Sequence, residues 1–267
     1  MRKHLSHLGL GLIFASAITL LVALAAGGAA APADSAPPPA KDDNLIWNDE
    51  FDGTALDTTK WIYRGLGPRK DGFNAKEAVT LDGQGHLVLT SSKSGDKVLT
   101  GMIATDGKFA HTFGYWECRV KFQRQIGFWS AFWLQSPQLG KVVGDTKASG
   151  TEIDIFEYLA NRPGKIQHTL HWDGYGKDHK SAPKVHEQAN LPDGWHTVGL
   201  DWTEKEYVFY VDGKETWRTD KGVSGTPEYI ILSTEVGTWA GKIANATLPD
   251  SVLFDYVRVY KQRPVQK

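Results

Sequence analysis

The sequence predicts an all-β fold, either a sandwich or a barrel. From residue 45 onward, hydrophobic and polar residues alternate with a period of two, as they do in strands that are buried on one face. Turn-forming residue pairs recur between the alternating segments, and no segment keeps a helical repeat. Many short strands joined by regular turns are typical of these two architectures.

Individual strands can be placed from this alternation. Turn pairs such as Asp82-Gly83 separate them. The segment 207–214 has the pattern of a hairpin that turns at Asp212-Gly213. The predicted strands are residues 87–91, 114–123, 130–135, 152–158, 166–172, 195–203, 206–211, 229–235 and 253–260.

The N-terminal region has the layout of a secretory signal peptide, with a basic start, a long uncharged apolar run and small alanines after it. Because the run is long, an uncleaved membrane anchor is the alternative. The expected location is therefore extracellular or periplasmic, or else the membrane surface. The predicted organisation is a signal peptide at 1–31, an Ala/Pro-rich linker at 32–43, one folded domain at 44–262 and a tail at 263–267.

Charge and cysteine content limit the possible partners. The chain has 30 Lys and Arg against 31 Asp and Glu, which gives no electrostatic basis for binding nucleic acid. Cys118 is the only cysteine, so the domain has no internal disulfide and must rely on its core. Cys118 lies in an alternating segment and is expected to be a buried structural thiol. A monomer is expected.

One segment, 152–157, carries three carboxylates. On a regular strand Glu152 and Asp154 point to one face and Glu157 to the other, because successive side chains alternate. A β-bulge around Ile155 and Phe156 inserts one extra residue and brings Glu157 round to the face of Glu152 and Asp154. An exposed strand with a polar solvent face is the alternative explanation of the same residues.

The spacing after such a bulge indicates a reaction. The Cα atoms of Glu152 and Glu157 are expected about 13 Å apart. If each side chain leans inward by roughly 3–4 Å, the carboxyl groups are about 5–6 Å apart, which is the separation of a retaining glycosidase. One glutamate then stays ionised and attacks the anomeric carbon, and the other stays protonated and donates to the leaving oxygen. Asp154 lies between them and can tune the nucleophile.

At this point the sequence resembles glycoside hydrolase family 16, the laminarinase-like β-glucanases, over residues 47–260. The segment 152–157 fits the family's bulged Glu-x-Asp-x-x-Glu strand, and 128–134 is similar to its Trp-Pro-Ala-Phe-Trp-Leu run, with Ser130 in place of Pro. The other matching segments are 113–120, 168–172, 210–213 and 255–260. The resemblance implies a jelly roll of two antiparallel sheets with a substrate cleft on the concave face.

The resemblance also implies residue roles. Glu152 becomes the nucleophile, Asp154 its assistant and Glu157 the acid/base, with no cofactor for catalysis. Trp129 and Trp133 are similar to cleft aromatics, and His171 to a cleft histidine whose alternative role is packing within a strand. The stretch 233–239 departs from the family pattern, and in it Glu235 is expected to face the cleft and Trp239 to stack on a sugar.

The resemblance further implies a structural Ca²⁺ on the convex side. The matching ligands are Glu50, the carbonyl of Gly85 and Asp255, and hard oxygen ligands of this kind suit calcium. The metal would tie the first and last strands together. Two surface acids at strand ends are the alternative.

The sequence predicts the reaction more specifically than it predicts the substrate. We expect a retaining, endo-acting hydrolase of a β-linked polysaccharide, with β-1,3-glucan as the leading substrate and β-1,3-galactan or another galactan as the alternative. The polar segment 171–180 departs from the laminarinase pattern and is either a substrate-binding loop or an ordinary solvated loop. Arg124, Lys177 and Lys180 are the cations considered for a sulfated substrate. A wall-remodelling transglycosylase, a carbohydrate-binding module and an anchored spacer are the rival functions.

Overall fold

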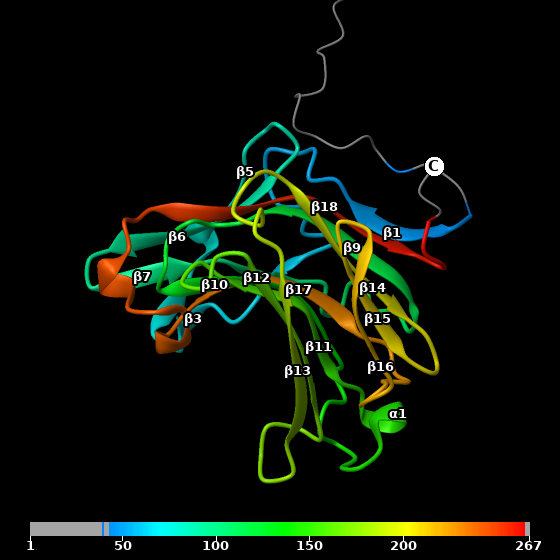
Figure 1. Ribbon diagram of the computed structural model, residues 1–267. Helices are drawn as coiled ribbons and strands as arrows, with labels where there is room; N and C mark the ends of the chain where they lie inside the picture. The colour runs from blue at the N-terminus through cyan, green and yellow to red at the C-terminus, as the bar shows by residue number, and fades with distance from the viewer. Residues whose placement is uncertain (1–38, 40–42, 265–267) are drawn as a thin grey trace, which may run out of the picture. The chain divides into compact units, whose positions relative to one another are not determined.

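The computed structural model describes residue 39 and residues 43–264, in which the chain forms two β-sheets packed face to face (Figure 1). The predicted signal peptide and most of the predicted linker lie outside these residues. The two-sheet sandwich and its antiparallel pairing are confirmed, because neighbouring strands pair antiparallel except for one short parallel pair between β4 (Gly72–Asn74) and β7 (Lys97–Thr100). In the described ranges, no helix is both long and apolar enough to span a bilayer.

The outer sheet has eleven strands and is centred on the long strand β18. Two short strands lie off its main path: β1 (Leu45–Asp49) pairs with β18, and β5 (Val79–Leu81) pairs with β6. The order along the main path is β16 (Lys214–Thr219), β15 (Tyr207–Val211), β14 (His196–Trp202), β9 (Gly114–Lys121), β18 (Asp250–Tyr260), β6 (Leu87–Ser94), β7, β4 and β3 (Gly67–Arg69).

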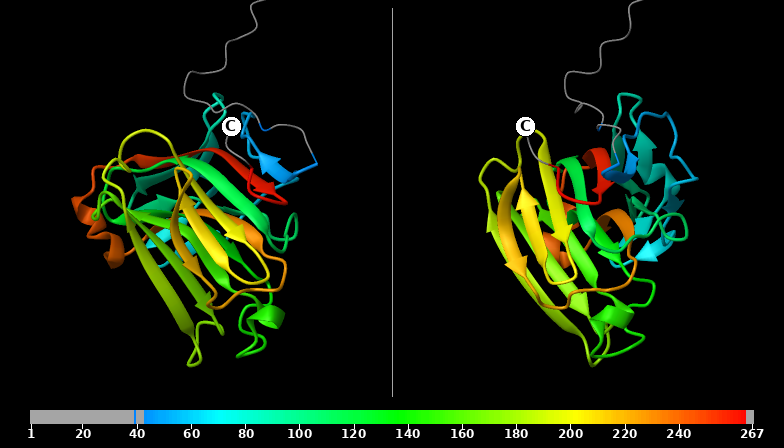
Figure 2. Two further views of the ribbon diagram at one scale, coloured as in Figure 1. Left: turned by 45° about the vertical axis from the view of Figure 1, so that its right-hand side comes forward. Right: turned by 90° about the vertical axis from the view of Figure 1, so that its right-hand side faces the viewer.

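The inner sheet has seven strands and carries the candidate site. Its order is β13 (Lys180–Glu187), β12 (Lys165–Trp172), β11 (Glu152–Leu159), β10 (Phe128–Gln135), β17 (Tyr229–Val236), β8 (Met102–Ala104) and β2 (Ile62–Tyr63). The helical elements are short: α1 (Thr146–Ser149), η1 (Lys76–Ala78), η2 (Thr238–Ala240) and η3 (Ile243–Asn245). The β12–β13 turn lies at the same end of the molecule as α1 in both views of Figure 2.

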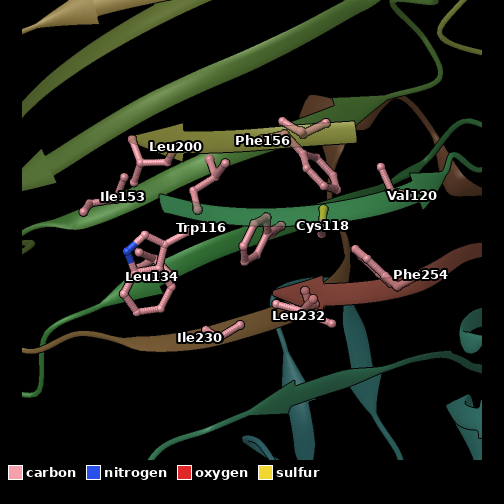
Figure 3. Packing of buried hydrophobic residues seen from close by; sticks show 14 of the residues in the cluster. Trp116, Cys118, Val120, Leu134, Ile153, Phe156, Leu200, Ile230, Leu232 and Phe254 are labelled. Atoms are coloured by element: carbon pink, nitrogen blue, oxygen red, sulfur yellow. The ribbon is translucent and has the colours of Figure 1, made fainter. Parts of the chain in front are cut away.

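The core lies between the facing sides of the two sheets. Ile153 and Phe156 of β11 are fully buried and point toward Trp116 and Cys118 of β9, as Figure 3 shows. Cys118 is therefore the buried structural thiol that the sequence predicts. Burial also raises the pKa of its thiol well above the ordinary value, so the group is unreactive. The opposite side of the inner sheet is left free to form a cleft.

All nine predicted strands are present, but several strands were not predicted. Strand β13 is the longest of those missed, and of its residues only Ala182 is buried. It lies at the edge of the inner sheet and carries lysines and Pro183, which are typical of protected edge strands. Without a buried face it has no hydrophobic alternation, so sequence periodicity could not detect it.

We expect Ile153→Ala to lower the free energy of unfolding by about 2–5 kcal/mol, because it leaves a cavity between the sheets. Denaturant titration followed by tryptophan fluorescence measures this loss. Thr80→Ala is the control, since Thr80 is an exposed strand residue and its loss should change stability by less than about 0.5 kcal/mol. Equal effects at the two positions would contradict the core assignment of Ile153.

Candidate active site

A β-bulge in β11 brings the three carboxylates together. Against β12, Asp154 pairs with Thr169 and Glu157 with Gln167, so two residues of β11 oppose one residue of β12. The register against β10 shifts at the same place, between Phe132 and Trp133. The predicted bulge is thus confirmed. Both residues of the bulge are buried in the core, and the acids on either side of it face the opposite way.

The acids face a cleft of about 530 Å³ on the exposed side of the inner sheet. Seven of the predicted site residues line it, along with others that the sequence did not indicate. The predicted ones are Glu152, Asp154, Glu157, Trp129, Trp133, His171 and Glu235, the last of them from β17. Further lining residues are Arg64, Arg69, Lys70, Ala131, Gln135, Tyr175 and His179.

Glu152 is held by two hydrogen-bond donors on one carboxylate oxygen. The side-chain amide of Gln135 donates to Glu152 Oε2 at 2.9 Å, and the hydroxyl of Tyr175 donates to the same oxygen. Gln135 is itself fixed, because its Oε1 accepts from Tyr229 at 2.6 Å and from Arg64 at 2.7 Å. Such a network holds the carboxylate in one orientation, as a nucleophile requires.

Glu157 and Asp154 are favoured in their protonated forms. Burial, followed by the charges of Asp154 and Glu152, raises the pKa of Glu157 well above its ordinary value. Burial and the neighbouring acids Glu152 and Glu235 likewise raise the pKa of Asp154. Thr169 Oγ1 donates to Glu157 Oε2 at 3.4 Å. A carboxyl group whose pKa is raised keeps its proton to higher pH, which suits it to general acid catalysis.

His171 lies beside the acids. Its Nε2 is 3.4 Å from Asp154 Oδ2, and its Nδ1 is 2.9 Å from Nε2 of His179. The ligand atoms of Glu152, Asp154 and His171 lie within 4.8 Å of one another, the one such group of potential metal ligands in the described part of the chain. His168 faces the core instead, where its Nδ1 is 2.7 Å from the carbonyl oxygen of Ile155.

The two cleft tryptophans are flanked by cations. Lys70 Nζ lies 4.6 Å from the ring centre of Trp129, and the guanidinium of Arg64 lies 5.9 Å from that of Trp133. Trp133 also donates its indole N–H to Ser233 at 3.1 Å. Both rings are almost fully buried. They form part of the cleft floor, and their predicted role in sugar stacking stays a prediction.

Glu235 and Trp239 are placed differently from each other. Glu235 is only 6% exposed and pairs with Arg69 at 2.9 Å, while its Oε2 lies 3.5 Å from Lys70 Nζ without a hydrogen bond. Trp239, in η2, packs edge-on against Trp129 at 5.4 Å and is outside the set of residues that line the cleft. Sugar binding by either residue stays a prediction.

The residues predicted to bind Ca²⁺ are engaged by arginines. The guanidinium of Arg258 donates to both carboxylate oxygens of Glu50, at 3.0 and 2.7 Å, and Arg119 donates to Asp255 Oδ2 at 2.7 Å. Gly85 lies in a turn with φ +91°. A calcium ion needs six to eight oxygen ligands, and two guanidinium groups at its carboxylates would repel it. The donor set in this arrangement does not fit calcium, whose binding stays a prediction.

Comparison with known proteins places the chain in a family. The model of glycosyl hydrolases family 16 matches residues 69–258, which include every residue that lines the cleft except Arg64. The chain belongs to glycosyl hydrolase family 16. A keratan-sulfate endo-1,4-beta-galactosidase of Sphingobacterium multivorum is 30% identical over 82% of this chain, and a glucan endo-1,3-beta-glucosidase of Niallia circulans is 29% identical over 82%. The chain spans 56% and 38% of the lengths of these two relatives.

Solved structures support the assignment to this family. A laminarinase from a Flavobacterium species superposes with a TM-score of 0.70 at 26% identity, covering 81% of this chain and 99% of its own. The catalytic domain of a laminarinase from Thermotoga petrophila gives a TM-score of 0.71 at 25% identity, covering 82% of this chain. The jelly roll expected from the sequence is thus shared with known family 16 enzymes.

Several site residues of this family 16 domain were missed, for different reasons. Gln135 lies two residues after Trp133, so the same alternation that places Trp133 in the cleft would also have placed Gln135 there. Tyr175 and His179 belong to segment 171–180, for which the sequence left open a substrate-binding loop or an ordinary solvated loop. Arg69 and Lys70 come from a short strand and turn with no periodic signal. The cations considered from sequence, Arg124, Lys177 and Lys180, are outside the set of residues that line the cleft. Arg124 pairs instead with Asp193, and Lys180 with Asp173.

We expect Tyr175→Phe to lower kcat/KM by about tenfold, because a hydrogen bond to a charged carboxylate contributes roughly 1.5–3 kcal/mol. The turn that carries Tyr175 packs closely against Gly140, where an added Cβ atom would come within 2.7 Å of Gly174. Steady-state kinetics on the cleaved polysaccharide measure the change. Tyr63→Phe, outside the cleft, is the control, and unchanged kinetics in Tyr175→Phe would exclude the positioning role.

Proposed function

We propose that this family 16 domain is a retaining, endo-acting glycoside hydrolase that cleaves β-1,3-glucan. The observation that carries the proposal is the bulge of β11, which sets Glu152, Asp154 and Glu157 on one wall of a cleft while the core takes Ile155 and Phe156. Glu152 and Glu157 have the opposed environments that a nucleophile and an acid need: one is held by hydrogen-bond donors, and burial raises the pKa of the other.

The reaction proceeds in two displacements. Glu152 attacks the anomeric carbon while Glu157 gives its proton to the leaving glycosidic oxygen, which yields a covalent glycosyl-enzyme and a free sugar end. Glu157, now ionised, takes a proton from water, and that water attacks the anomeric carbon and releases Glu152. Asp154 lies between them in β11, and burial raises its pKa, which favours a protonated carboxyl group that can donate to the nucleophile and stabilise its carboxylate when it is released.

The choice of β-1,3-glucan rests on the relatives and structural neighbours named for laminarin or 1,3-β-glucan. A panel of laminarin, lichenan, agarose, carrageenan and arabinogalactan, with products sized over time, tests both substrate and mode. We expect laminarin to give a ladder of oligosaccharides from the earliest time points, as internal cleavage does. Release of a single small sugar from chain ends would contradict the endo mode.

A galactan is the second candidate substrate. The relative with 30% identity is named for the β-1,4-galactosidic bonds of keratan sulfate, and three cations, Arg64, Arg69 and Lys70, line this cleft. Keratan sulfate is therefore added to the panel. Cleavage of keratan sulfate or agarose in place of laminarin would favour the galactan and leave the retaining mechanism unchanged.

Secretion is proposed from the sequence of the N-terminal region, with its basic start, apolar run and small residues. N-terminal sequencing of the mature protein from the culture medium tests it. A mature chain that begins near residue 32 is expected, and an intact N-terminus found in the membrane fraction would favour the anchor.

A further inference from the structure

A second hollow, of about 340 Å³, adjoins the face of the inner sheet that carries the acids. Its apolar part is formed by Leu159 of β11 and Val185 of β13, and Val185 is 44% exposed although it is a β-branched strand residue. Charged and amide groups surround this part. The residues that line this β12–β13 hollow are Leu159, Arg162, Lys165, Ile166, Gln167, Val185 and Glu187.

Strand register places the hollow beside the acid/base. Glu157 pairs with Gln167, and Gln167 pairs with Val185, so the three residues form one row across β11, β12 and β13. Residues in such a row share a face of the sheet, and Val185 is therefore about 10 Å from Glu157, two strand spacings away. On the same face, Lys165 of β12 and Glu187 of β13 pair two residues further along the strands. The hollow is thus continuous with the catalytic face.

The two carboxylates fix the side on which the leaving sugar departs. A retaining enzyme attacks the anomeric carbon from the side opposite the leaving oxygen, which the acid/base protonates. Along β11 the direction from Glu152 to Glu157 continues to Leu159, which contributes to the hollow. The hollow therefore lies at the end of the strand toward which the leaving group moves.

A hydrogen-bonded chain joins the hollow to the acid/base. The side-chain amide of Gln167 donates to Thr169 Oγ1 at 3.1 Å, and Thr169 donates to Glu157 at 3.4 Å. Lys165 and Glu187 form an ion pair of 2.7 Å across the hollow's rim. An apolar floor for the C–H face of a sugar and polar groups for its hydroxyls are what a carbohydrate subsite needs.

We propose that the β12–β13 hollow is a leaving-group-side subsite for neutral sugar units of the polysaccharide. This inference rests on the proposed hydrolase function and adds where the chain lies on one side of the cleaved bond. The subsite orients the leaving sugar in the first displacement and, in the second, can hold an acceptor sugar in place of water. Occupancy of the hollow then governs cleavage of long chains more than cleavage of aryl glycosides, which carry no sugar on that side.

The test compares two substrates in three variants. The substrates are laminarin and an aryl glycoside of a laminari-oligosaccharide, whose leaving group is a nitrophenol. For Val185→Asp, which places a carboxylate beside Glu187 in the hollow, we expect the ratio of kcat/KM on laminarin to kcat/KM on the aryl glycoside to fall about tenfold, equivalent to about 1.4 kcal/mol. Val185→Ala is the milder substitution, because it introduces no charge, and it should lower the ratio two- to threefold. Thr80→Asp, at the exposed position of β5, is the matched control and should leave the ratio unchanged.

An unchanged ratio in both Val185 variants, or a loss that follows sugar units added at the non-reducing end, would overturn the subsite. Absence of wild-type activity on laminarin would instead contradict the β-1,3-glucan proposal. In that case the same ratio is measured with the polysaccharide that the panel shows to be cleaved and with its aryl glycoside, so the two failures are distinguished.

Discussion

Replacing Glu152 by Gln is expected to reduce turnover of the polysaccharide by on the order of 10⁴-fold or more, because the covalent intermediate can no longer form. The amide has almost the shape of the carboxylate, and the donors Gln135 and Tyr175 can still reach its oxygen. Binding should therefore persist. Isothermal titration of Glu152→Gln with oligosaccharides, next to steady-state kinetics, separates the two effects.

The matched control is Glu77→Gln, which changes an exposed glutamate of η1 outside the cleft. It should leave kcat within twofold of the wild-type value. Substantial turnover in Glu152→Gln would remove Glu152 as the nucleophile. Lost binding together with lost turnover would indicate a damaged cleft rather than a missing nucleophile.

Replacing Glu157 by Gln is expected to lower kcat/KM on polysaccharide by about 10²–10⁴-fold, since the leaving sugar then departs without a proton. An aryl glycoside with a strongly acidic phenol needs no such proton, and its first displacement should be nearly normal. The comparison of the two substrates measures acid catalysis directly. An equal loss on both would contradict the role of Glu157 as the acid.

The same residue sets the expected pH dependence. Activity requires protonated Glu157, and its pKa is raised by burial and by the neighbouring acids, so the alkaline limb of kcat/KM should fall above the ordinary range of a glutamate. Folding stability shifts in the same sense. Because the pKa of Glu157 is higher in the folded state, this group contributes stability at pH values below its pKa in the unfolded chain. That contribution is lost as the pH rises through its pKa in the folded state. The rate profile of the wild-type enzyme from pH 4 to 9 measures the limb.

The sequence predicts the central strands and the three acids because both leave a periodic signal. The alternation of 152–154 and its break at Ile155 and Phe156, together with the family resemblance, predict the bulge, and the structure shows the register shift at this place. Trp133 of β10 and His171 of β12 follow from the resemblance of these two neighbouring strands to the family pattern. In these elements one face must be buried, so the hydrophobic pattern determines where the polar side chains go.

The rest of the site depends on contacts that no local pattern encodes. Arg69 reaches the cleft because its strand, β3, lies at the end of the outer sheet's path, and it meets Glu235 from 166 positions away in the chain. Strand β13, with its exposed Val185, carries no buried face to reveal it. The predicted calcium ligands show the opposite case, in which similarity matched the acids but the arginines paired with them were not considered.

A mechanism-based label tests the central claim most directly. A 2-deoxy-2-fluoro glycoside of the cleaved oligosaccharide with an activated leaving group forms a long-lived glycosyl-enzyme, and peptide mass spectrometry locates the attached sugar. The bulged arrangement predicts one sugar per chain, attached through the carboxyl of Glu152. Attachment to any other residue, or rapid hydrolysis with inversion at the anomeric carbon, would contradict the account.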